Sequence, residues 1–333
     1  MKKFLTAVLC LMLFCLPLCS CKQNVYPLTA TQFMMDTVIT VTLYDGDSSA
    51  LDGAIELCRK YDNMLSKTVK TGDVYKINTS NGRPVEVSHE TAELIRFALE
   101  IAESTEGAFD PTILPLAELW DVANATSVPP SADIEAALKS VNYKNISVDG
   151  NVVTAADGAT IDLGGIAKGY IADKVKEYLI SEGVKSAVIN LGGNTLLLGN
   201  KNGNPFSVGV QKPFGLSGEL SAILMLDDKT AVTSGVYQRY FEADGKLYHH
   251  IIDTDSGYPV DNGIYAVTVI TDSSCIADGL STACLTLGID KGKELAEQYG
   301  AELILITSDG ELVLTDGLEL NPRDGSNIIT LKT

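Results

Sequence analysis

The chain has 333 residues, 45% of them hydrophobic, and a formal net charge of −18. A chain of this length can bury one large core or two lobes. Its strong negative charge excludes nucleic acid as an expected partner, because nucleic acid would be repelled. An anionic small molecule is compatible with the sequence where a cation or a helix N-terminus offsets the charge locally.

The first 20 residues have the pattern of a secretory signal peptide. Two lysines precede an uncharged apolar run from Phe4 to Leu18, which is shorter than the roughly 20 residues of a membrane span. "LCSC", ending at Cys21, resembles the lipobox of bacterial lipoproteins, in which the cysteine is lipidated. Ordinary secretory cleavage is the alternative.

We therefore expect residues 1–20 to be removed, Cys21 to carry a lipid within a tether of residues 21–32, and residues 33–333 to form the folded domain. The mature protein would be extracytoplasmic and anchored to the bacterial membrane. Loss of the two positive charges of Lys2 and Lys3 would take the formal charge from −18 to −20. The three later cysteines, Cys58, Cys275 and Cys284, lack metal-binding spacing and are expected to be buried thiols.

Helical and strand patterns alternate irregularly along the chain. Residues 36–46 have the β-branched and aromatic alternation of a strand. Short strands are expected over 145–162 and dominate 187–269, and "SDGE" at Asp309 and Gly310 predicts a hairpin. Helices are expected over 48–66, where serines would cap the start, over 88–104, from about 131, over 274–287 and over 291–299. This order favours an α+β fold with largely antiparallel sheets.

"TIDLGGIAKGYIADKVKEYLISEG" predicts a short strand, a turn at Gly164 and Gly165, and a helix that ends at Gly183. Glycines at a helix start let a ligand approach backbone N–H groups, and Lys168 adds a positive charge there. The stretch is a candidate phosphate site without P-loop spacing. A close-packed strand-to-helix turn is the alternative.

Asp278 and Thr282 are four residues apart on a predicted helix. Their oxygens would project from one face and could share a hard cation such as Mg²⁺, with phosphate and water completing its shell. The alternative is an exposed aspartate beside a threonine that bonds its own helix backbone.

Four further stretches carry weaker signals. "GAFDPT" contains Asp110 and Thr112 around a proline, and "VINLGGN" places Gly192 and Gly193 after an apolar strand. Small polar residues precede a hairpin over Asp244-Gly245, whose second strand carries two adjacent histidines. Neighbouring strand residues point to opposite faces, so only one histidine can face a given site. The small polar residues are Thr233, Ser234 and Gly235, and the histidines are His249 and His250.

Taken in order, these stretches resemble the ApbE family of FAD:protein FMN transferases over nearly the whole mature chain. The matching motifs are "MDT", "GAFDPT", "IDLGGIAKGYIAD", "INLGGN", "VTSGVYQRYF", "HIIDTDSGYP" and "ADGLSTA". The resemblance implies a two-lobed fold with FAD between the lobes and a divalent metal, normally Mg²⁺, at the pyrophosphate. It implies that FMN moves to a threonine or serine hydroxyl of an exported acceptor protein of a redox complex, which bears a threonine-containing motif, and that AMP leaves.

The resemblance also assigns residues. Asp278, Thr282 and the carbonyl of Ala167 match the metal ligands, and His250 matches the histidine linked to transfer. Lys168 would neutralise charge beside the metal. The residues expected to bind FAD are Met35, Asp110, Thr112, Gly164, Gly165, Lys168, Asp173, Gly192, Gly193, Thr233, Ser234, Gly235, His250 and Ile251.

The chain departs from the family pattern at several positions. Asp36 replaces the usual glycine of "MGT", and Thr68 stands where an aromatic residue is common. In the usual "HIIDPRTGYP", the proline, arginine and threonine are replaced by Thr254, Asp255 and Ser256.

Two other functions are compatible with the sequence. An FAD pyrophosphatase would use the same site with water in place of the acceptor hydroxyl and yield FMN and AMP. A non-catalytic FAD-binding lipoprotein is a different class of protein. The presence of Asp278, Thr282 and His250 disfavours the latter, because binding alone requires none of them.

Overall fold

The computed structural model describes residues 27–156 and 158–331. The predicted signal peptide and Cys21 lie outside these residues. Within the described ranges, no helix combines the length and apolar character needed to cross a membrane.

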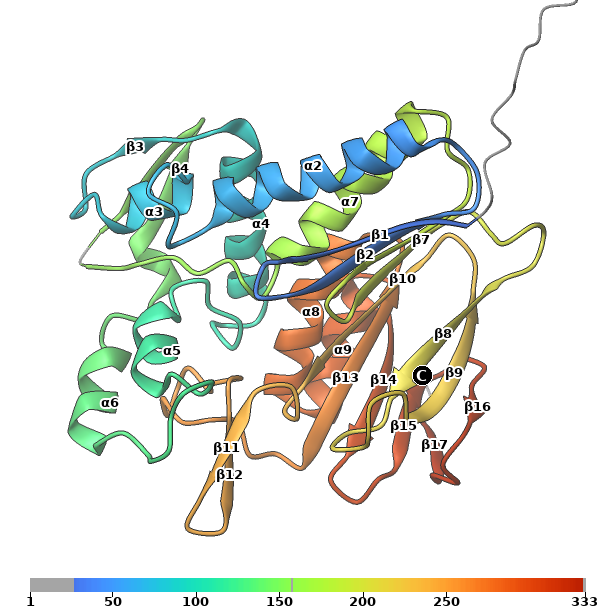
Figure 1. The fold of residues 1–333 in the computed structure, drawn as a ribbon. Coiled ribbons are helices and arrows are strands. Elements are labelled where there is room, and N and C mark those ends of the chain that lie inside the picture. The colour runs from blue at the N-terminus through green and yellow to red at the C-terminus, as the bar shows by residue number, and fades with distance from the viewer. Residues whose placement is uncertain (1–26, 157, 332–333) are drawn as a thin grey trace, which may run out of the picture.

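A nine-stranded sheet forms the centre of the molecule (Figure 1). Every neighbouring pair is antiparallel except β15 and β17, which are parallel. In spatial order its strands are β1 Leu28–Met34, β2 Thr37–Leu43, β6 Ala187–Leu191, β7 Asn194–Leu198, β10 Thr230–Gly235, β13 Ile264–Thr271, β14 Glu302–Thr307, β15 Leu312–Thr315 and β17 Ile328–Leu331.

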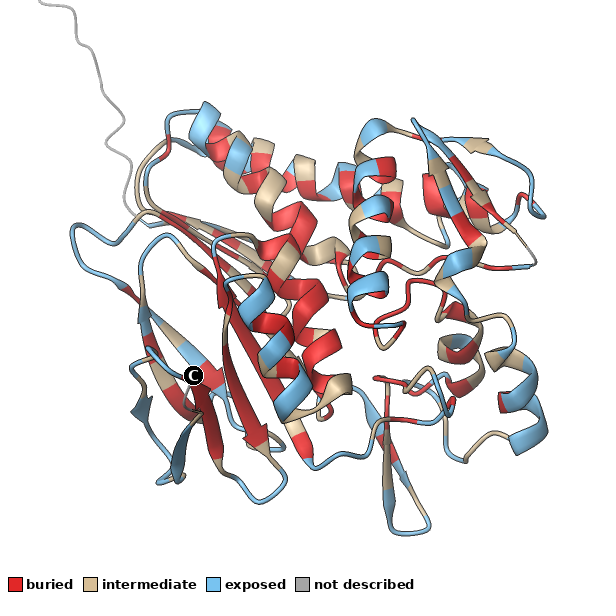
Figure 2. Ribbon diagram, turned by 180° about the vertical axis from the view of Figure 1, so that it is seen from behind, coloured by how far each residue is buried: buried red, intermediate tan, exposed pale blue. Residues whose placement is uncertain are grey.

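Helices cover one face of this sheet, and a smaller sheet covers the other. Buried residues alternate along β13: Val267 and Val269 belong to the core beneath the helices, whereas Ala266 and Ile270 belong to the core beneath the small sheet. Figure 2 shows the buried residues on the strands and on the facing sides of the helices. The covering elements are α2 Ser48–Leu65, α7 Ala167–Ser181, α8 Ser274–Leu287 and α9 Ile289–Gln298 on one face, and β8 Phe206–Gln211, β9 Leu220–Leu226 and β16 Asn321–Pro322 on the other.

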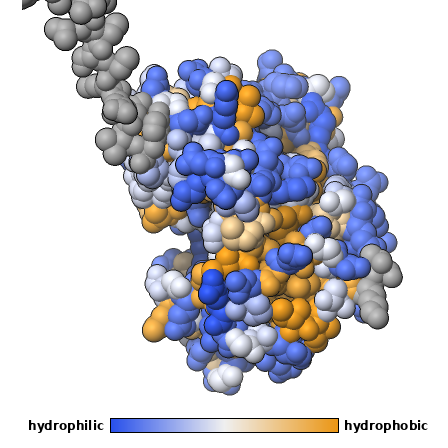
Figure 3. Space-filling model, turned by 90° about the vertical axis from the view of Figure 1, so that its right-hand side faces the viewer, coloured by the Kyte–Doolittle hydropathy of each residue, from blue (hydrophilic) through white to orange (hydrophobic). Residues whose placement is uncertain are grey.

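Apolar side chains are exposed on β9 of the small sheet and on β17, the edge strand of the large sheet. Met225 of β9 is 56% exposed, and Ile328 and Ile329 of β17 are each 38% exposed. Figure 3 views the side of the molecule that carries β8, β9 and β17, where apolar side chains gather between hydrophilic areas.

The remaining elements pack beside the sheet. A third apolar cluster surrounds Trp120, whose indole N–H donates to the carbonyl of Gly257 at 2.8 Å. This bond joins the α5–α6 region to the loop after the histidine hairpin. The elements are α3 Asp73–Asn78, β3 Val85–Glu86, α4 His89–Ser104, α5 Leu114–Trp120, α6 Ser131–Leu138, a 3₁₀ turn Tyr143–Asn145, β4 Ile146–Asp149, β5 Val152–Ala155, β11 Tyr240–Ala243 and β12 Lys246–His249.

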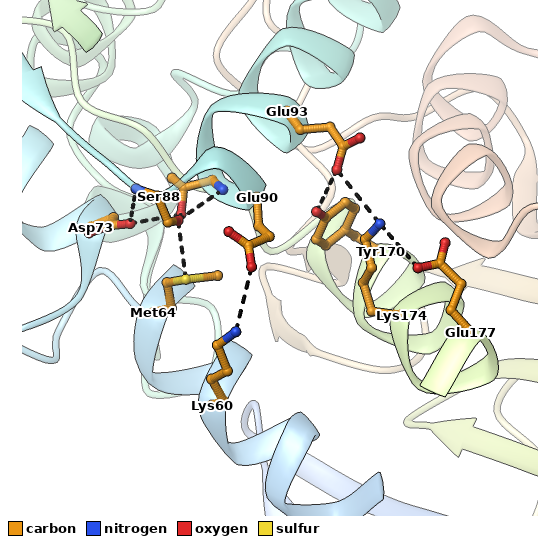
Figure 4. A network of polar contacts seen from close by, with 10 residues as sticks. Lys60, Met64, Asp73, Ser88, Glu90, Glu93, Tyr170, Lys174 and Glu177 are labelled. Carbon is orange, nitrogen blue, oxygen red and sulfur yellow. Dashed lines mark hydrogen bonds and ion pairs between the residues drawn. The ribbon is translucent and has the colours of Figure 1, made fainter. Parts of the chain in front are cut away.

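A polar network joins α2, α3, α4 and α7 (Figure 4). The buried carboxylate of Asp73 accepts hydrogen bonds from the Ser88 N–H, the Thr91 hydroxyl and Lys76. Burial alone would raise its pKa, but these donors hold the pKa below its ordinary value. On α7, the Tyr170 hydroxyl donates to Glu93 of α4 at 2.6 Å. The network fixes α4 against α7, which carries part of the site.

The predicted α+β class with largely antiparallel sheets is confirmed. Two local predictions differ from the structure. Residues 28–32 were assigned to the tether, whereas they lie in β1; this edge strand buries only Met34, so it lacks the apolar alternation that marks a strand. Serines were expected to cap the first helix, but Asp47 accepts the capping bond from the Ala50 N–H at 3.0 Å.

The β1–β2 turn supplies a test of stability. Met35 and Asp36 have φ of 53° and 54°, the left-handed pair of a two-residue hairpin turn, in which glycine is favoured at the second position. Asp36→Gly is therefore expected to raise the free energy of unfolding by about 1 kcal/mol, measured by urea denaturation. The matched control, Asp52→Gly in helix α2, should lower it by a similar amount; destabilisation by both variants would contradict the strain at Asp36.

Candidate active site

The N-terminal turns of α7 and α8 lie in direct contact. The N–H of Gly169 donates to Asp278 Oδ2 at 2.9 Å. A Cβ on Gly169 would lie only 2.7 Å from the Asp278 Cβ, so this position of α7 accepts no side chain. Glycine thus allows the start of α7 to reach a carboxylate on α8.

Asp278 is 3% exposed and faces a cation. Lys168 Nζ lies 3.8 Å from Asp278 Oδ1 and donates to the carbonyl of Gly164 at 2.9 Å. One oxygen of Asp278 is therefore held by backbone, while the other faces an ammonium group at long range. This second oxygen is the one that a metal ion could take.

The glycine turn before α7 lies close to the hydroxyl of Thr282, one turn after Asp278 on α8. A Cβ on Gly165 would lie 3.7 Å from Thr282 Oγ1 and 3.3 Å from the ring of Phe109. Ala167, whose carbonyl is the third predicted ligand, begins α7 two residues later. The structure thus brings Ala167, Asp278 and Thr282 to one junction.

This donor set fits a hard cation. The described ranges contain no group of three His, Cys, Asp or Glu side chains that could hold a metal, so the junction offers one carboxylate and neutral oxygens. Mg²⁺ prefers few protein oxygens and takes phosphate and water for the rest. The residues therefore fit a magnesium ion that is shared with a phosphate ligand.

Several residues that were predicted to bind FAD lie on the large sheet, further from α8. Gly192 and Gly193 have φ of 66° and 93° in the β6–β7 turn. A Cβ on Gly193 would lie 3.7 Å from the Thr233 carbonyl, and one on Gly192 would clash with Thr37, which follows the Met35–Asp36 turn. The Met35–Asp36 turn, the β6–β7 turn with Gly192 and Gly193, and Thr233 on β10 are therefore neighbours.

A cavity of about 340 Å³ lies between the large sheet and β8–β9. Gly193, Thr233, Tyr237 and Thr268 line it, and the Thr233 and Thr268 hydroxyls are 2.8 Å apart. Ser234, the next residue on β10, instead contacts α8. The strand thus presents Thr233 to the cavity and Ser234 to the metal junction, as alternation requires. Gly235 is buried and packs against the Tyr237 ring.

The two histidines have different surroundings. His249 is 3% exposed; its Nε2 lies 2.8 Å from the Val260 carbonyl, and its Nδ1 accepts from the N–H of the buried Ile251. His250 is half-buried, with Nδ1 3.3 Å from the Arg239 carbonyl. A carbonyl only accepts, so Nδ1 carries the proton and Nε2 of His250 is left as an acceptor.

Burial, together with the smaller effects of the positive charges of Arg239 and Lys168, lowers the pKa of His250 to about 4. His250 is therefore neutral near pH 7 and can accept a proton.

Three predicted FAD-binding residues have other partners. Asp110 accepts from the N–H and hydroxyl of Thr112 and from the Tyr143 N–H, and burial raises its pKa. Asp173 accepts from the Ser273 hydroxyl and from the N–H groups of Ser274 and Cys275. Asp110 and Thr112 hold a loop in place, and Asp173 caps α8 and fixes its start against α7.

Other residues at the site were not predicted. Lys67 Nζ lies 2.6 Å from Asp162 Oδ2, while Asp162 Oδ1 accepts from the Gly164 N–H. Thr254 donates to the Gly107 carbonyl at 2.8 Å, which ties the histidine loop to "GAFDPT". Lys67 and Asp162 are 95 residues apart in the sequence, so no local sequence pattern predicts that they pair.

Comparison with known proteins finds relatives over most of the chain. The model of the ApbE family matches residues 35–305. A protein of Klebsiella pneumoniae named FAD:protein FMN transferase is 36% identical over 310 residues, which cover 91% of this chain and 96% of that protein. One of the same name from Treponema pallidum is 29% identical over 325 residues, or 90% of each chain.

Solved structures show the same fold. The ApbE protein of Thermotoga maritima superposes with a TM-score of 0.79 at 32% identity, over 90% of this chain and 97% of that one. The flavinyl transferase ApbE of Pseudomonas stutzeri, in its apo form, gives 0.76 at 30% identity, over 90% and 95% of the two chains. The chain described here belongs to the ApbE family.

Proposed function

We propose that this protein transfers FMN from FAD to a threonine or serine hydroxyl of an exported acceptor protein, with Mg²⁺ as the metal and AMP as the leaving group. The observation that carries the proposal is the convergence of Asp278, Thr282 and Lys168 on the glycine turn before α7. The names of the relatives support the same activity.

In this reaction the acceptor oxygen bonds to the phosphorus of the FMN half, and the bond from that phosphorus to the bridging oxygen of AMP breaks. Phosphoryl transfer requires mainly positioning and charge neutralisation. Asp278, Thr282 and the Ala167 carbonyl would hold Mg²⁺, which would supply charge neutralisation at the pyrophosphate. Lys168 adds a second positive charge, and His250 Nε2 would accept the acceptor's proton.

We further propose that Cys21 carries a lipid and holds the enzyme outside the cytoplasm, on the membrane where its acceptors lie. The lipobox-like sequence before Cys21 supports this proposal. The intact mass of the protein recovered from membranes would test it, since a Cys21→Ser variant should lose the mass of the lipid.

The enzyme should be incubated with FAD and Mg²⁺, with and without an acceptor domain that bears the threonine motif, while intact masses and free nucleotides are read. The proposal predicts an acceptor heavier by one FMN, equimolar AMP, and loss of both with EDTA. FMN and AMP without labelling would instead indicate a pyrophosphatase, and intact bound FAD would indicate a carrier.

The pKa of His250 predicts an unusual pH profile. With a pKa of about 4, His250 loses its ability to accept a proton only as the pH falls through that value. The pH dependence of kcat/KM reports the pKa values of groups in the free enzyme. We expect kcat/KM for FAD to hold nearly constant from about pH 8 to about pH 5.5. A limb centred on the ordinary histidine value of 6.5 would contradict the environment described for His250; a His89→Gln control should leave the profile unchanged.

A further inference from the structure

Three hydroxyl groups form a chain between β10 and α8. Ser234 Oγ lies 2.7 Å from Ser281 Oγ and 3.3 Å from Thr282 Oγ1. Ser281 Oγ donates to the carbonyl of Asp278 at 2.9 Å. Ser281 has no exposed surface, so its hydroxyl depends on these protein partners.

The direction of the chain follows from counting protons. A hydroxyl has one proton and a carbonyl oxygen has none. Because Ser281 donates to Asp278, its oxygen must accept from Ser234. Ser234 has then used its own proton and can only accept from Thr282.

This direction has a consequence for Thr282. A hydroxyl that binds a metal ion must offer a lone pair to it and send its proton elsewhere. Without Ser234, the Thr282 proton would lose this acceptor and turn to the backbone of its own helix, where a threonine commonly bonds the carbonyl three or four residues earlier. That rotation would move the lone pairs of Thr282 away from the junction.

We propose that Ser234 and Ser281 are positioning residues for the metal site: they draw the proton of Thr282 toward the sheet and leave its lone pairs directed at the ion. This role rests on the proposed metal-dependent function. It differs from the direct FAD contact that the resemblance assigns to Ser234. Groups behind a ligand typically change metal affinity by about 10-fold to 100-fold.

The test is Mn²⁺ affinity, measured by electron paramagnetic resonance of the free ion, with the protein alone and with ADP, which carries a pyrophosphate but has no flavin to transfer. Ser234→Ala and Ser281→Ala should each raise the Kd for Mn²⁺ about 10-fold. Ser234→Thr, which keeps the hydroxyl, should stay within about twofold of wild type. The matched control is Thr286→Ala, which removes a hydroxyl one turn further along α8 that donates to the Thr282 carbonyl; it should leave the Kd unchanged.

The outcomes separate the two proposals. Wild-type protein that binds no Mn²⁺ in either condition would overturn the metal site and the positioning role together. Wild-type binding that Asp278→Ala abolishes, but that both serine variants retain at full affinity, would leave the metal site standing and overturn the positioning role. An equal loss in Thr286→Ala would also overturn it, because any hydroxyl on the helix would then have the same effect.

Discussion

Replacement of Asp278 by asparagine is expected to lower the rate of AMP release from FAD by about 10³-fold or more. Asparagine keeps an oxygen to accept the Gly169 N–H, but it removes the negative charge that would hold the metal and balance Lys168. Asp278→Ala should be equally inactive. It should also be less stable by roughly 1–3 kcal/mol, since it leaves the Gly169 N–H buried and unpaired.

The asparagine variant separates chemistry from folding. Its thermal unfolding midpoint in metal-free buffer should match that of wild type within a few degrees, while its activity is lost. Asp290→Asn, at the exposed start of α9, is the matched control and should keep full activity. Turnover by Asp278→Asn at the wild-type rate would remove the proposed metal site.

Replacement of His250 by alanine is expected to slow FMN transfer by about 10²-fold to 10⁴-fold, the usual contribution of a general base. His249→Ala should instead lower stability by roughly 2 kcal/mol and leave the rate per folded molecule nearly unchanged. The reason is that His249 is buried and bonds the Val260 carbonyl and the Ile251 N–H, whereas His250 Nε2 is left as an acceptor.

Transfer rates should be measured with a purified acceptor and normalised to the folded fraction from circular dichroism. His250→Gln supplies a second variant, because it keeps hydrogen-bonding capacity but cannot take a proton near pH 7. Equal loss of normalised rate in His249→Ala and His250→Ala would show that the assignment of different roles to the two histidines is wrong.

Local sequence signals predicted much of the fold. Helix α4 begins after the capping residue Ser88, and α8 spans Ser274–Leu287 as expected. The hairpins over Asp244-Gly245 and Asp309-Gly310 also form as expected. Each of these features is encoded within a few consecutive residues, by a cap, a turn pair or an apolar period.

The site was less predictable because its decisive contacts join distant segments. Asp173, which the resemblance assigns to FAD, caps a helix about 100 residues later, a contact that no local signal indicates. Ser234 and Ser281 meet across 47 residues, and their bond depends on the packing of α8 against β10. Residue type can suggest a chemical role, but only tertiary structure shows which partner takes each oxygen.

The most direct test of the account is a crystal structure with Mn²⁺ and ADP, with the ion located by its anomalous scattering. We expect a peak at roughly 2.0–2.3 Å from an Asp278 carboxylate oxygen, Thr282 Oγ1 and the Ala167 carbonyl, with phosphate and water oxygens completing the shell. A peak elsewhere, or ADP bound with its pyrophosphate away from the glycine turn before α7, would contradict it.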